Sequence, residues 1–227
     1  MMDTAHPFEP VRLEPVRVWD LPLRLFHWTL VSAVAAAIAS GLAGGDWMGL
    51  HAVAGQAIAA LLVFRLAWGV LGSTHARFAS FWPTPRRLRD YLQGRWDGAG
   101  HNPLGALSVL ALLLLLALQV ATGLAGNDEI AFVGPWAHWV SDDLSLRLTG
   151  WHRVLSKLLF GWLALHLLAI AWHEGIRRSK LLAAMLSGRK HTHPDHAARG
   201  GGIWALVVAL TIAGGAALAL RLSAGAG

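Results

Sequence analysis

The sequence predicts an all-α integral membrane protein, in which a bundle of four transmembrane helices is followed by a fifth, C-terminal transmembrane helix. Three observations support this fold class: the composition, the number of apolar runs and the distribution of charge. Of the 227 residues, 55% are hydrophobic and 14% are charged, and the mean hydropathy is +0.48. A soluble domain carries about 25% charged residues, so the composition favours a membrane domain.

Five apolar runs supply the predicted helices. They cover residues 25–42, 53–71, 104–124, 151–172 and 203–220. Each run approaches the roughly 20 residues that a helix needs to cross a bilayer, and helix tilt accommodates differences in length. We do not expect the first run to be a cleavable signal peptide, because a long, charged, proline-containing segment precedes it.

Charge predicts the orientation of these helices. Most Lys and Arg residues lie in the N-terminal segment and in the loops after the second and fourth runs. The loops on the other side carry Asp46, Asp128, Glu129, Asp142 and Asp143. The positive-inside rule therefore predicts a cytoplasmic N-terminus and an external C-terminus. It also explains the net charge of +6 without nucleic-acid binding.

The runs and charges divide the chain into four parts. We predict a cytoplasmic N-terminal segment at 1–24, a four-helix domain at 25–180, a cytoplasmic His-rich linker at 181–202 and a C-terminal transmembrane helix at 203–227. The segment 135–150 is expected to form a short helix on the outer surface. Several tryptophans near the run ends suggest an interfacial belt; they are Trp47, Trp68, Trp151, Trp172 and Trp204.

The chain has no cysteine. This excludes disulfides, thiolate zinc sites and cysteine-ligated iron–sulfur clusters. It also excludes the C-x-x-C-H attachment of c-type haem. A haem in this chain would therefore be held without a thioether link.

Four histidines lie at membrane depth, where ionisable side chains usually mark function. His152 and His166 are 14 residues apart, so they share a helix face and lie about 21 Å apart along the axis. His27 begins the first run near the depth of His166, and His51 lies before the second run near the depth of His152. Neutral imidazole is a common iron ligand. We therefore predict two iron sites, one at His27 with His166 and one at His51 with His152.

Other interpretations of the histidines remain open at this point. Any one of the four could be a capping residue bonded to backbone, although four residues paired by depth make this less favoured. His173 rivals His166, because it lies on the same face about 10 Å nearer the cytoplasm. His101 and His138 are expected at the surface. His191, His193 and His196 could bind a metal loosely, but a flexible polar loop is favoured.

Arginines near the predicted iron sites could pair with haem propionates. The candidates are Arg24, Arg65 and Arg153. Arg65 could equally mark the membrane boundary, and Arg24 and Arg153 could snorkel to the surface. His75 with Arg65 and Arg77 could receive a quinone head group, although a solvated loop is the simpler interpretation for His75.

The residues described above together resemble the bacterial di-haem cytochrome b family. This family includes the b-type subunit of nickel–iron hydrogenases and small quinone-linked b cytochromes. The resemblance covers residues 17–190, and the matching stretches are "VWDLPLRLFHW", "LHAVAGQ", "FRLAWGVLGSTHARF", "HNPLGALSVLALLLLLALQVATGL", "GWHRVLSKLLFGWLALHLLAI" and "LLAAMLSGRK". It implies four core helices that bind two haem b groups in the bacterial inner (cytoplasmic) membrane, with His27, His51, His152 and His166 as ligands.

The resemblance also implies electron transfer between the quinone pool and a redox partner, such as a c-type cytochrome or a dehydrogenase subunit. One alternative is superoxide oxidation at the outer haem with quinone reduction, where Arg147, Arg153 and His138 would steer the anion against Asp142 and Asp143. A non-redox membrane anchor or small transporter is a second alternative. The five runs contain no Asp or Glu, which weakens a proton-coupled transporter. No catalytic residue is predicted.

Overall fold

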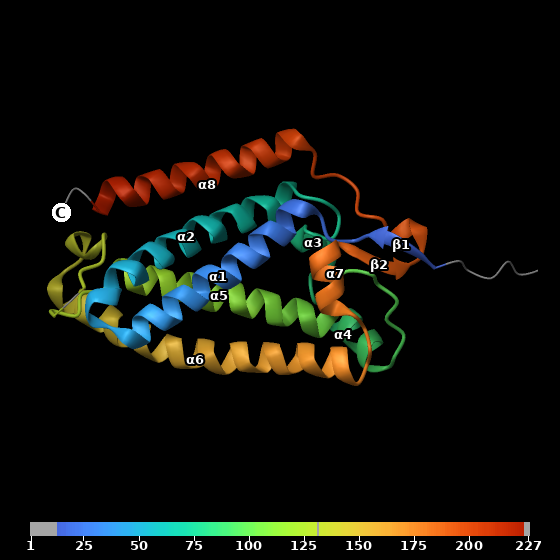
Figure 1. Ribbon diagram of the computed structural model, residues 1–227, viewed down its shortest axis with the longest axis horizontal. Helices are drawn as coiled ribbons and strands as arrows, with labels where there is room; N and C mark the ends of the chain where they lie inside the picture. The colour runs from blue at the N-terminus through green and yellow to red at the C-terminus, as the bar shows by residue number, and fades with distance from the viewer. Residues whose placement is uncertain (1–12, 131, 225–227) are drawn as a thin grey trace, which may run out of the picture.

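A computed structural model describes residues 13–130 and 132–224, which form an elongated helical bundle (Figure 1). Residues 1–12 of the predicted N-terminal segment and 225–227 of the predicted C-terminal helix segment lie outside the described residues. The elements are, in chain order, β1 (Glu14–Arg17), α1 (Leu21–Ala43), η1 (Gly45–Trp47), α2 (Met48–Leu71), α3 (Phe78–Phe81), α4 (Pro85–Leu92), α5 (Pro103–Leu124), η2 (Ala137–Trp139), α6 (Asp142–Gly175), α7 (Leu181–Ser187), β2 (Arg189–Thr192), η3 (Pro194–His196) and α8 (Ile203–Ala224).

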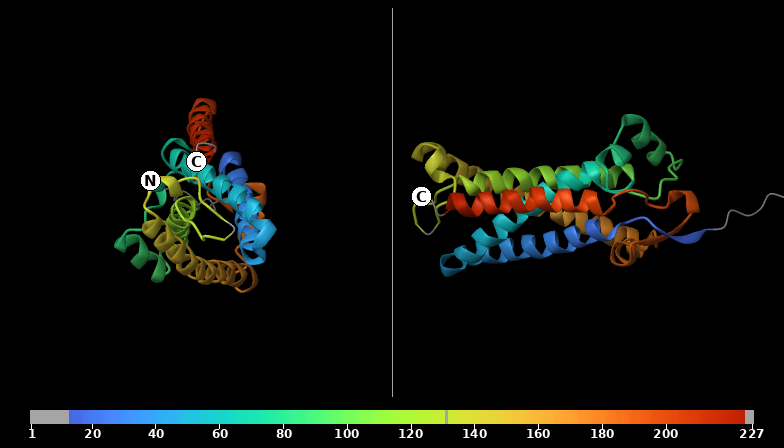
Figure 2. Two further views of the ribbon diagram at one scale, coloured as in Figure 1. Left: turned by 90° about the vertical axis from the view of Figure 1, so that its left-hand side faces the viewer. Right: turned by 90° about the horizontal axis from the view of Figure 1, so that it is seen from above.

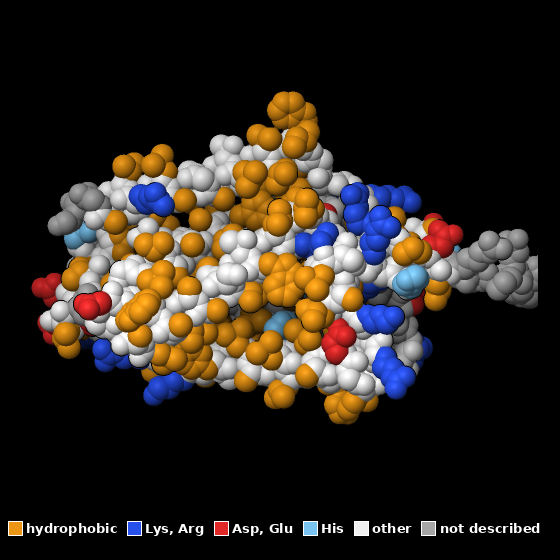
Figure 3. Space-filling model, viewed as in Figure 1, with side chains coloured by type: hydrophobic (Ala, Val, Ile, Leu, Met, Phe, Trp, Pro, Cys, Tyr) orange, Lys and Arg blue, Asp and Glu red, His pale blue; other side chains and the backbone are white. Residues whose placement is uncertain are grey.

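The five long helices are the five predicted membrane spans. Helices α1, α2, α5, α6 and α8 are each long and apolar enough to cross a bilayer, so the predicted all-α membrane fold is confirmed. The elements β1, α4, α7 and β2 lie at one end of the bundle, and the loop around η2 lies at the other (Figure 1). Figure 3 shows a broad apolar surface between the ends, with Lys and Arg gathered near β1. We call the β1–β2 end the basic end.

Polar caps fix where these helices begin. The Asp20 carboxylate accepts from the Leu23 amide at 2.7 Å to cap α1, and the Asn102 side chain accepts from the Gly105 amide at 2.7 Å to cap α5. The hydroxyl of Ser141 caps α6, which then continues unbroken for 34 residues. The predicted surface helix at 135–150 is therefore wrong, because its second half forms the first turns of α6.

The first four long helices pack as two pairs, and contacts between α2 and α5 join the pairs. Helix α1 packs against α2, α5 packs against α6, and α2 also contacts α5. Helix α8 lies along α2 on the outside of the other four (Figure 2). Ala209 is fully buried on α8 and Ala213 is nearly so, and such small residues allow close helix approach in membranes.

The largest cluster of buried apolar residues in the described chain lies at the basic end. Its core contains Val18, Trp19, Phe26, Phe64 and Trp68, together with Ala209 and Ala213 of α8. The indole nitrogen of Trp68 is 3.2 Å from both oxygens of Asp20, to which it donates. The expectation that Trp68 belongs to an interfacial belt is therefore wrong. The other tryptophans of that set are exposed, as an interfacial position requires; they are Trp47, Trp151, Trp172 and Trp204.

The His-rich segment before α8 is folded. Strand β2 pairs antiparallel with β1, with Glu14 opposite Thr192 and Arg17 opposite Arg189. The flexible loop expected at "KHTHPDH" is therefore wrong, because this tract forms β2 and η3. Within the described ranges, no group of three or more His, Asp or Glu side chains is arranged to hold a metal ion.

Candidate functional site

Two imidazoles lie close together at the end opposite the basic end. His51 lies in the first turns of α2 and His152 lies on α6. Their ring centroids are 6.0 Å apart and their planes are inclined at 81°. An imidazole nitrogen lies about 2 Å from a bound transition metal, so two rings on opposite sides of one ion have centroids about 6 Å apart. The pair therefore has the separation that one shared iron requires.

We call His51 and His152 the outer pair, because their end of the bundle is predicted to face the outside of the cell. Backbone carbonyls orient both rings of this pair. His51 Nδ1 is 2.8 Å from the carbonyl oxygen of Ala37, and His152 Nδ1 is 2.9 Å from that of Gln119. A carbonyl can only accept, so each Nδ1 is the donor. The neutral tautomer then carries its acceptor lone pair on Nε2, which is the arrangement that ligating histidines usually show. On His152 this lone pair accepts from the amide of Gln119, which an iron bound at Nε2 would displace.

Two glycines make room for the same rings. A Cβ at Gly41 of α1 would lie 2.9 Å from His51 Nδ1, and a Cβ at Gly123 of α5 would lie 2.9 Å from His152 Cε1. These distances are too short for any side chain. Each glycine therefore allows an imidazole to contact the backbone of the neighbouring helix. Glycine is needed there for lack of space and not for its backbone conformation.

The outer pair lines a cavity of about 480 Å³ between α1, α2, α5 and α6. Its walls are mainly small or apolar residues, including Ala37, Gly41, Ala52, Gly55 and Leu116. Pockets for cofactors span about 300–1,000 Å³ with mostly apolar walls. Arg153 also lines the cavity with an exposed side chain, so it is available to an anionic group there.

Gln119 joins the outer pair, although sequence analysis missed it. Its amide nitrogen lies 2.9 Å from His152 Nε2 and donates to it. Its Oε1 is buried and has no hydrogen-bond partner among the described residues. The sequence feature that could have identified Gln119 is that it carries the only amide side chain in the apolar run 104–124.

The second predicted pair lies nearer the basic end. His27 on α1 and His166 on α6 are within electrostatic range of each other. His27 Nδ1 is buried without a hydrogen-bond partner in the part of the chain that the structure describes, and so are Nε1 of Trp28 and Nε1 of Trp162. Trp162 precedes His166 by one turn of α6. A bound group or an ordered water would supply partners for these atoms, so this inner pair is compatible with a bound group.

His173, the rival of His166, lines a different cavity. Its Nδ1 is 3.2 Å from the hydroxyl oxygen of Ser179. That second cavity lies at the basic end and has a volume of about 520 Å³, and its lining includes Tyr91, Trp96 and Arg177.

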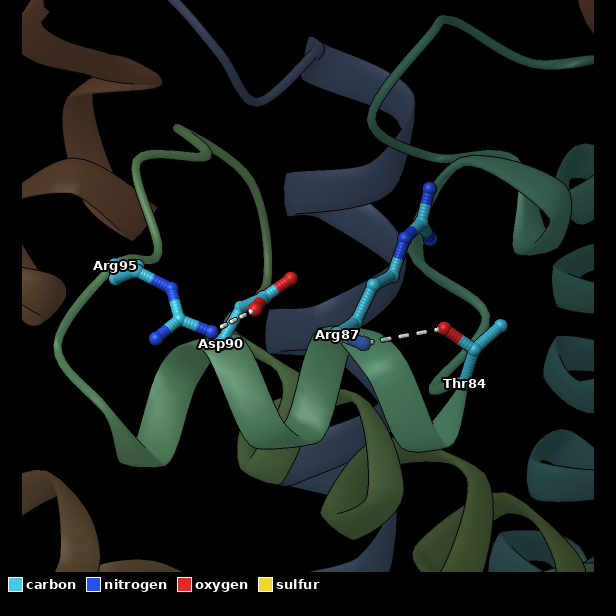
Figure 4. Close-up of polar contacts among 4 residues, drawn as sticks. All are labelled: Thr84, Arg87, Asp90 and Arg95. Atoms are coloured by element: carbon cyan, nitrogen blue, oxygen red, sulfur yellow. Dashed lines mark hydrogen bonds and ion pairs between the residues drawn. The ribbon is translucent and has the colours of Figure 1, made fainter.

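Helix α4 and the loop after it supply part of this lining. The loop is held by an ion pair of 2.7 Å between Arg95 and Asp90, and Thr84 caps α4 (Figure 4).

The remaining candidates lie at the basic end with other partners. Arg24 donates through Nε to the carbonyl of Met185 at 3.2 Å and through a terminal nitrogen to that of Leu186, so it caps α7. Arg65 is buried, with 2% of its surface exposed. His75 Nε2 donates to the carbonyl of His196 at 2.8 Å, so its loop is packed rather than solvated.

His101 departs from the prediction of a surface position. Its ring lies 4.6 Å from the ring of Trp19 and 4.7 Å from that of Phe81, centroid to centroid. Its Nδ1 is buried and has no partner within the described residues. The prediction is wrong because the loop before α5 folds back over the core of the basic end, which spacing along the chain does not reveal.

Comparison with known proteins identifies the family to which the chain is similar. The profile of the family described as prokaryotic cytochrome b561 matches residues 18–188. The chain is 24% identical over 215 residues to a probable Ni/Fe-hydrogenase B-type cytochrome subunit of Bradyrhizobium diazoefficiens, covering 77% of this chain and 85% of the relative. No solved structure matches the chain significantly.

Two further relatives carry similar names. The chain is 23% identical to the probable Ni/Fe-hydrogenase B-type cytochrome subunit of Rhizobium leguminosarum bv. viciae, over 82% of this chain and 93% of the relative. It is 21% identical to the probable Ni/Fe-hydrogenase 1 B-type cytochrome subunit of Escherichia coli strain K12, over 77% and 90%. The chain therefore belongs to the prokaryotic cytochrome b561 family, and it is a multi-pass protein of the bacterial inner membrane that transfers electrons through b-type haem.

Proposed function

We propose that the chain carries electrons across the membrane through two b haems, one held by His51 and His152 and the other by His27 and His166. The 6.0 Å separation of the outer rings is the observation that carries the proposal. His152 and His166 lie about 21 Å apart along α6, so the two haems would stand one above the other across the bilayer.

The residues around the outer pair would determine how its haem behaves. Bound haem supplies one-electron chemistry. The carbonyls of Ala37 and Gln119 hold the Nδ1–H groups, and such bonds fix ring orientation and raise ligand basicity. The walls of the cavity are mostly small or apolar, and the polarity around a haem is a further influence on its potential.

The electron donor and acceptor are a quinone and a redox partner protein in this proposal. The relatives' names support a hydrogenase as one class of partner for this chain. Quinone would exchange electrons with the inner haem at the basic end, which is predicted to face the cytoplasm.

The second cavity supports a place for the quinone head group. Tyr91, Trp96 and Trp172 supply aromatic walls, and His173 and Arg177 supply polar groups. Because Ser179 fixes the Nδ1 proton of neutral His173, Nε2 can accept from a quinol hydroxyl, and after protonation it can donate to a quinone carbonyl. His173 also lies only about 10 Å along α6 from His166.

An optical spectrum of the purified protein tests the two-haem proposal. A dithionite-reduced minus oxidised spectrum should show b-type haem, and haem extraction should give two haems per chain. A colourless preparation would contradict the proposal and favour a membrane anchor or transporter. Superoxide consumption by the same preparation would favour the alternative in which the outer haem oxidises superoxide.

Stopped-flow reduction of the haems by a short-chain quinol tests the quinone site. His173→Leu should slow reduction at least several-fold, because it removes the proton acceptor. His75→Gln should leave the rate unchanged, because His75 is bonded to the backbone of His196. The opposite pattern would move the quinone site to the Arg65 and His75 region, and unchanged rates in both would exclude both positions.

A further inference from the structure

Four segments bring cationic and imidazole side chains together at the basic end. Arg65 comes from α2, His75 from the loop after α2, His101 from the loop before α5, and Lys190 from β2. His101 is within electrostatic range of the other three and of His27. The cluster therefore lies beside the inner pair, although its members are far apart in the sequence.

Arg65 is the most buried member of this cluster. One terminal nitrogen donates to the carbonyl of Ala76 at 3.0 Å, and the guanidinium lies 4.4 Å from the centroid of the Phe78 ring. The other terminal nitrogen is buried with no hydrogen-bond partner in residues 13–130 and 132–224. A charged donor that is 98% removed from solvent and unpaired is costly, so an acceptor is expected beside it.

The nearest carboxylate does not supply that acceptor. Asp20 is within electrostatic range of Arg65. Its two oxygens, however, accept from the Leu23 amide, the Trp68 indole and the Ser73 hydroxyl. No ion pair joins Asp20 to Arg65 in the described chain. Asp20 thus serves as a helix cap and a core anchor, and it offsets the charge of Arg65 only at a distance.

His101 and Lys190 add two more donors that lack an anion. Lys190 Nζ donates to the carbonyl of Ala99 at 2.8 Å and lies 5.4 Å from the ring centroid of Trp19. Burial lowers the pKa of Lys190 below its ordinary value. Burial, reinforced by Arg65 and then Lys190, lowers the pKa of His101 to about 3. In the chain alone, the cations Arg65 and Lys190 thus lie near the buried imidazole nitrogen of His101.

We propose that Arg65, His101 and Lys190 form a carboxylate site that holds the propionate groups of the inner porphyrin. Charge-assisted bonds to a carboxylate are about twice as strong as neutral ones, and the unpaired nitrogens of Arg65 and His101 would gain partners. The inference rests on the proposed function, since it needs a haem at His27 and His166. Arg24, the other arginine considered at this end, is already bonded to the carbonyls of α7.

Redox titration of the purified, haem-loaded protein tests the site. Arg65→Gln and Lys190→Gln should each lower the midpoint potential of one haem and leave the other unchanged, because removing a nearby cation favours the more positive oxidised iron. Arg65→Lys should restore most of the lost potential. Arg86→Gln is the matched control: it removes an exposed arginine of α4 at the same end and should change neither potential.

Reconstitution with an iron porphyrin whose propionates are methyl esters sharpens the test. The ester removes the anions, so Lys190→Gln should then have a much smaller effect on potential. An equal shift with ester and acid would overturn the inference, because the cations would then act on the iron alone. Wild-type potentials in both Arg65→Gln and Lys190→Gln would also overturn it. A colourless wild-type protein would instead overturn the proposed function itself. If Arg65→Gln does not fold, Lys190→Gln in the peripheral strand β2 still decides the question.

Discussion

The two histidine pairs lie in differently built ends of the same bundle. At the outer pair, the chain orients both imidazoles with carbonyls and leaves a cavity of about 480 Å³ between four helices. At the basic end, it builds a dense core around Val18 and Trp68, both fully buried, and leaves polar atoms of His27, Arg65 and His101 without partners in the described residues. The end at the outer pair thus has a cavity that could hold a cofactor, whereas the basic end has a packed core with polar groups that lack partners in the described residues.

This contrast shows two ways in which a membrane protein can prepare a cofactor site. The outer site depends on space, because helix α6 can approach α5 only while Gly123 lacks a side chain. The inner site depends on its frame, because Asp20 ties α1, α2 and the following loop together. Changes that fill space should therefore damage the outer site, and changes that break hydrogen bonds should damage the basic end.

The largest effect is expected from filling the space beside His152. In Gly123→Ala the new methyl group would lie 2.9 Å from His152 Cε1, so the ring must leave the position in which it lies beside His51. We expect the occupancy of one haem to fall several-fold while the other stays near one per chain, as measured by haem extraction. Gly161→Ala is the matched control, because a Cβ there meets no atom within 4 Å. Equal haem contents in the two variants would show that Gly123 does not shape the site.

A smaller effect, on stability, is expected from breaking the frame of the basic end. Asp20→Ala removes a helix cap and the acceptor of two buried donors, Trp68 and Ser73. We expect a loss of roughly 2–4 kcal/mol of unfolding free energy, measured by denaturant titration in detergent. Asn102→Ala, which removes only a cap from α5, should cost about 1 kcal/mol. A loss no greater in Asp20→Ala would mean that the buried bonds contribute little.

The effect of acid is the least local one, since it builds up gradually with pH. Folded His101 stays neutral down to about pH 3, whereas the unfolded chain binds a proton near pH 6.5. The unfolded state thus binds more protons between these values, so stability falls as pH falls below about 6.5, with a slope approaching about 1.4 kcal/mol per pH unit.

His101→Phe should reduce this acid sensitivity in the haem-free protein, because phenylalanine cannot bind the proton and can still pack between Trp19 and Phe81. The measurement is the melting temperature from pH 7 to pH 4. Parallel curves for wild type and variant would place the acid sensitivity on other groups.

The sequence predicted the membrane helices well, because each contains an apolar run of sufficient length to cross a bilayer. Hydropathy placed the starts of α5 and α8 within one residue, but it misplaced the start of α6. Helix α6 begins at Asp142, nine residues before its apolar run, because the Ser141 cap and not hydrophobicity determines that start. Trp68 was misplaced for a similar reason, since its position near a run end does not reveal the Asp20 partner that buries it.

The outer pair followed from depth along two helices, and the structure brings His51 and His152 together. Spacing could not find Gly41 and Gly123, because their role arises from the approach of neighbouring helices. The same holds for His101 and Lys190, which reach the inner end through loop and strand packing. The assignment of the four histidines as ligands stays a prediction that the haem content of variants can test.

Haem content and low-temperature electron paramagnetic resonance of single histidine variants test the central claim most directly. Wild type should contain two haems with two distinct low-spin signals. His152→Ala and His51→Ala should each lose the same signal, and His27→Ala and His166→Ala should each lose the other, with one haem per chain remaining in every case. Loss of different signals within a pair, or two haems retained in any of the four variants, would contradict the account.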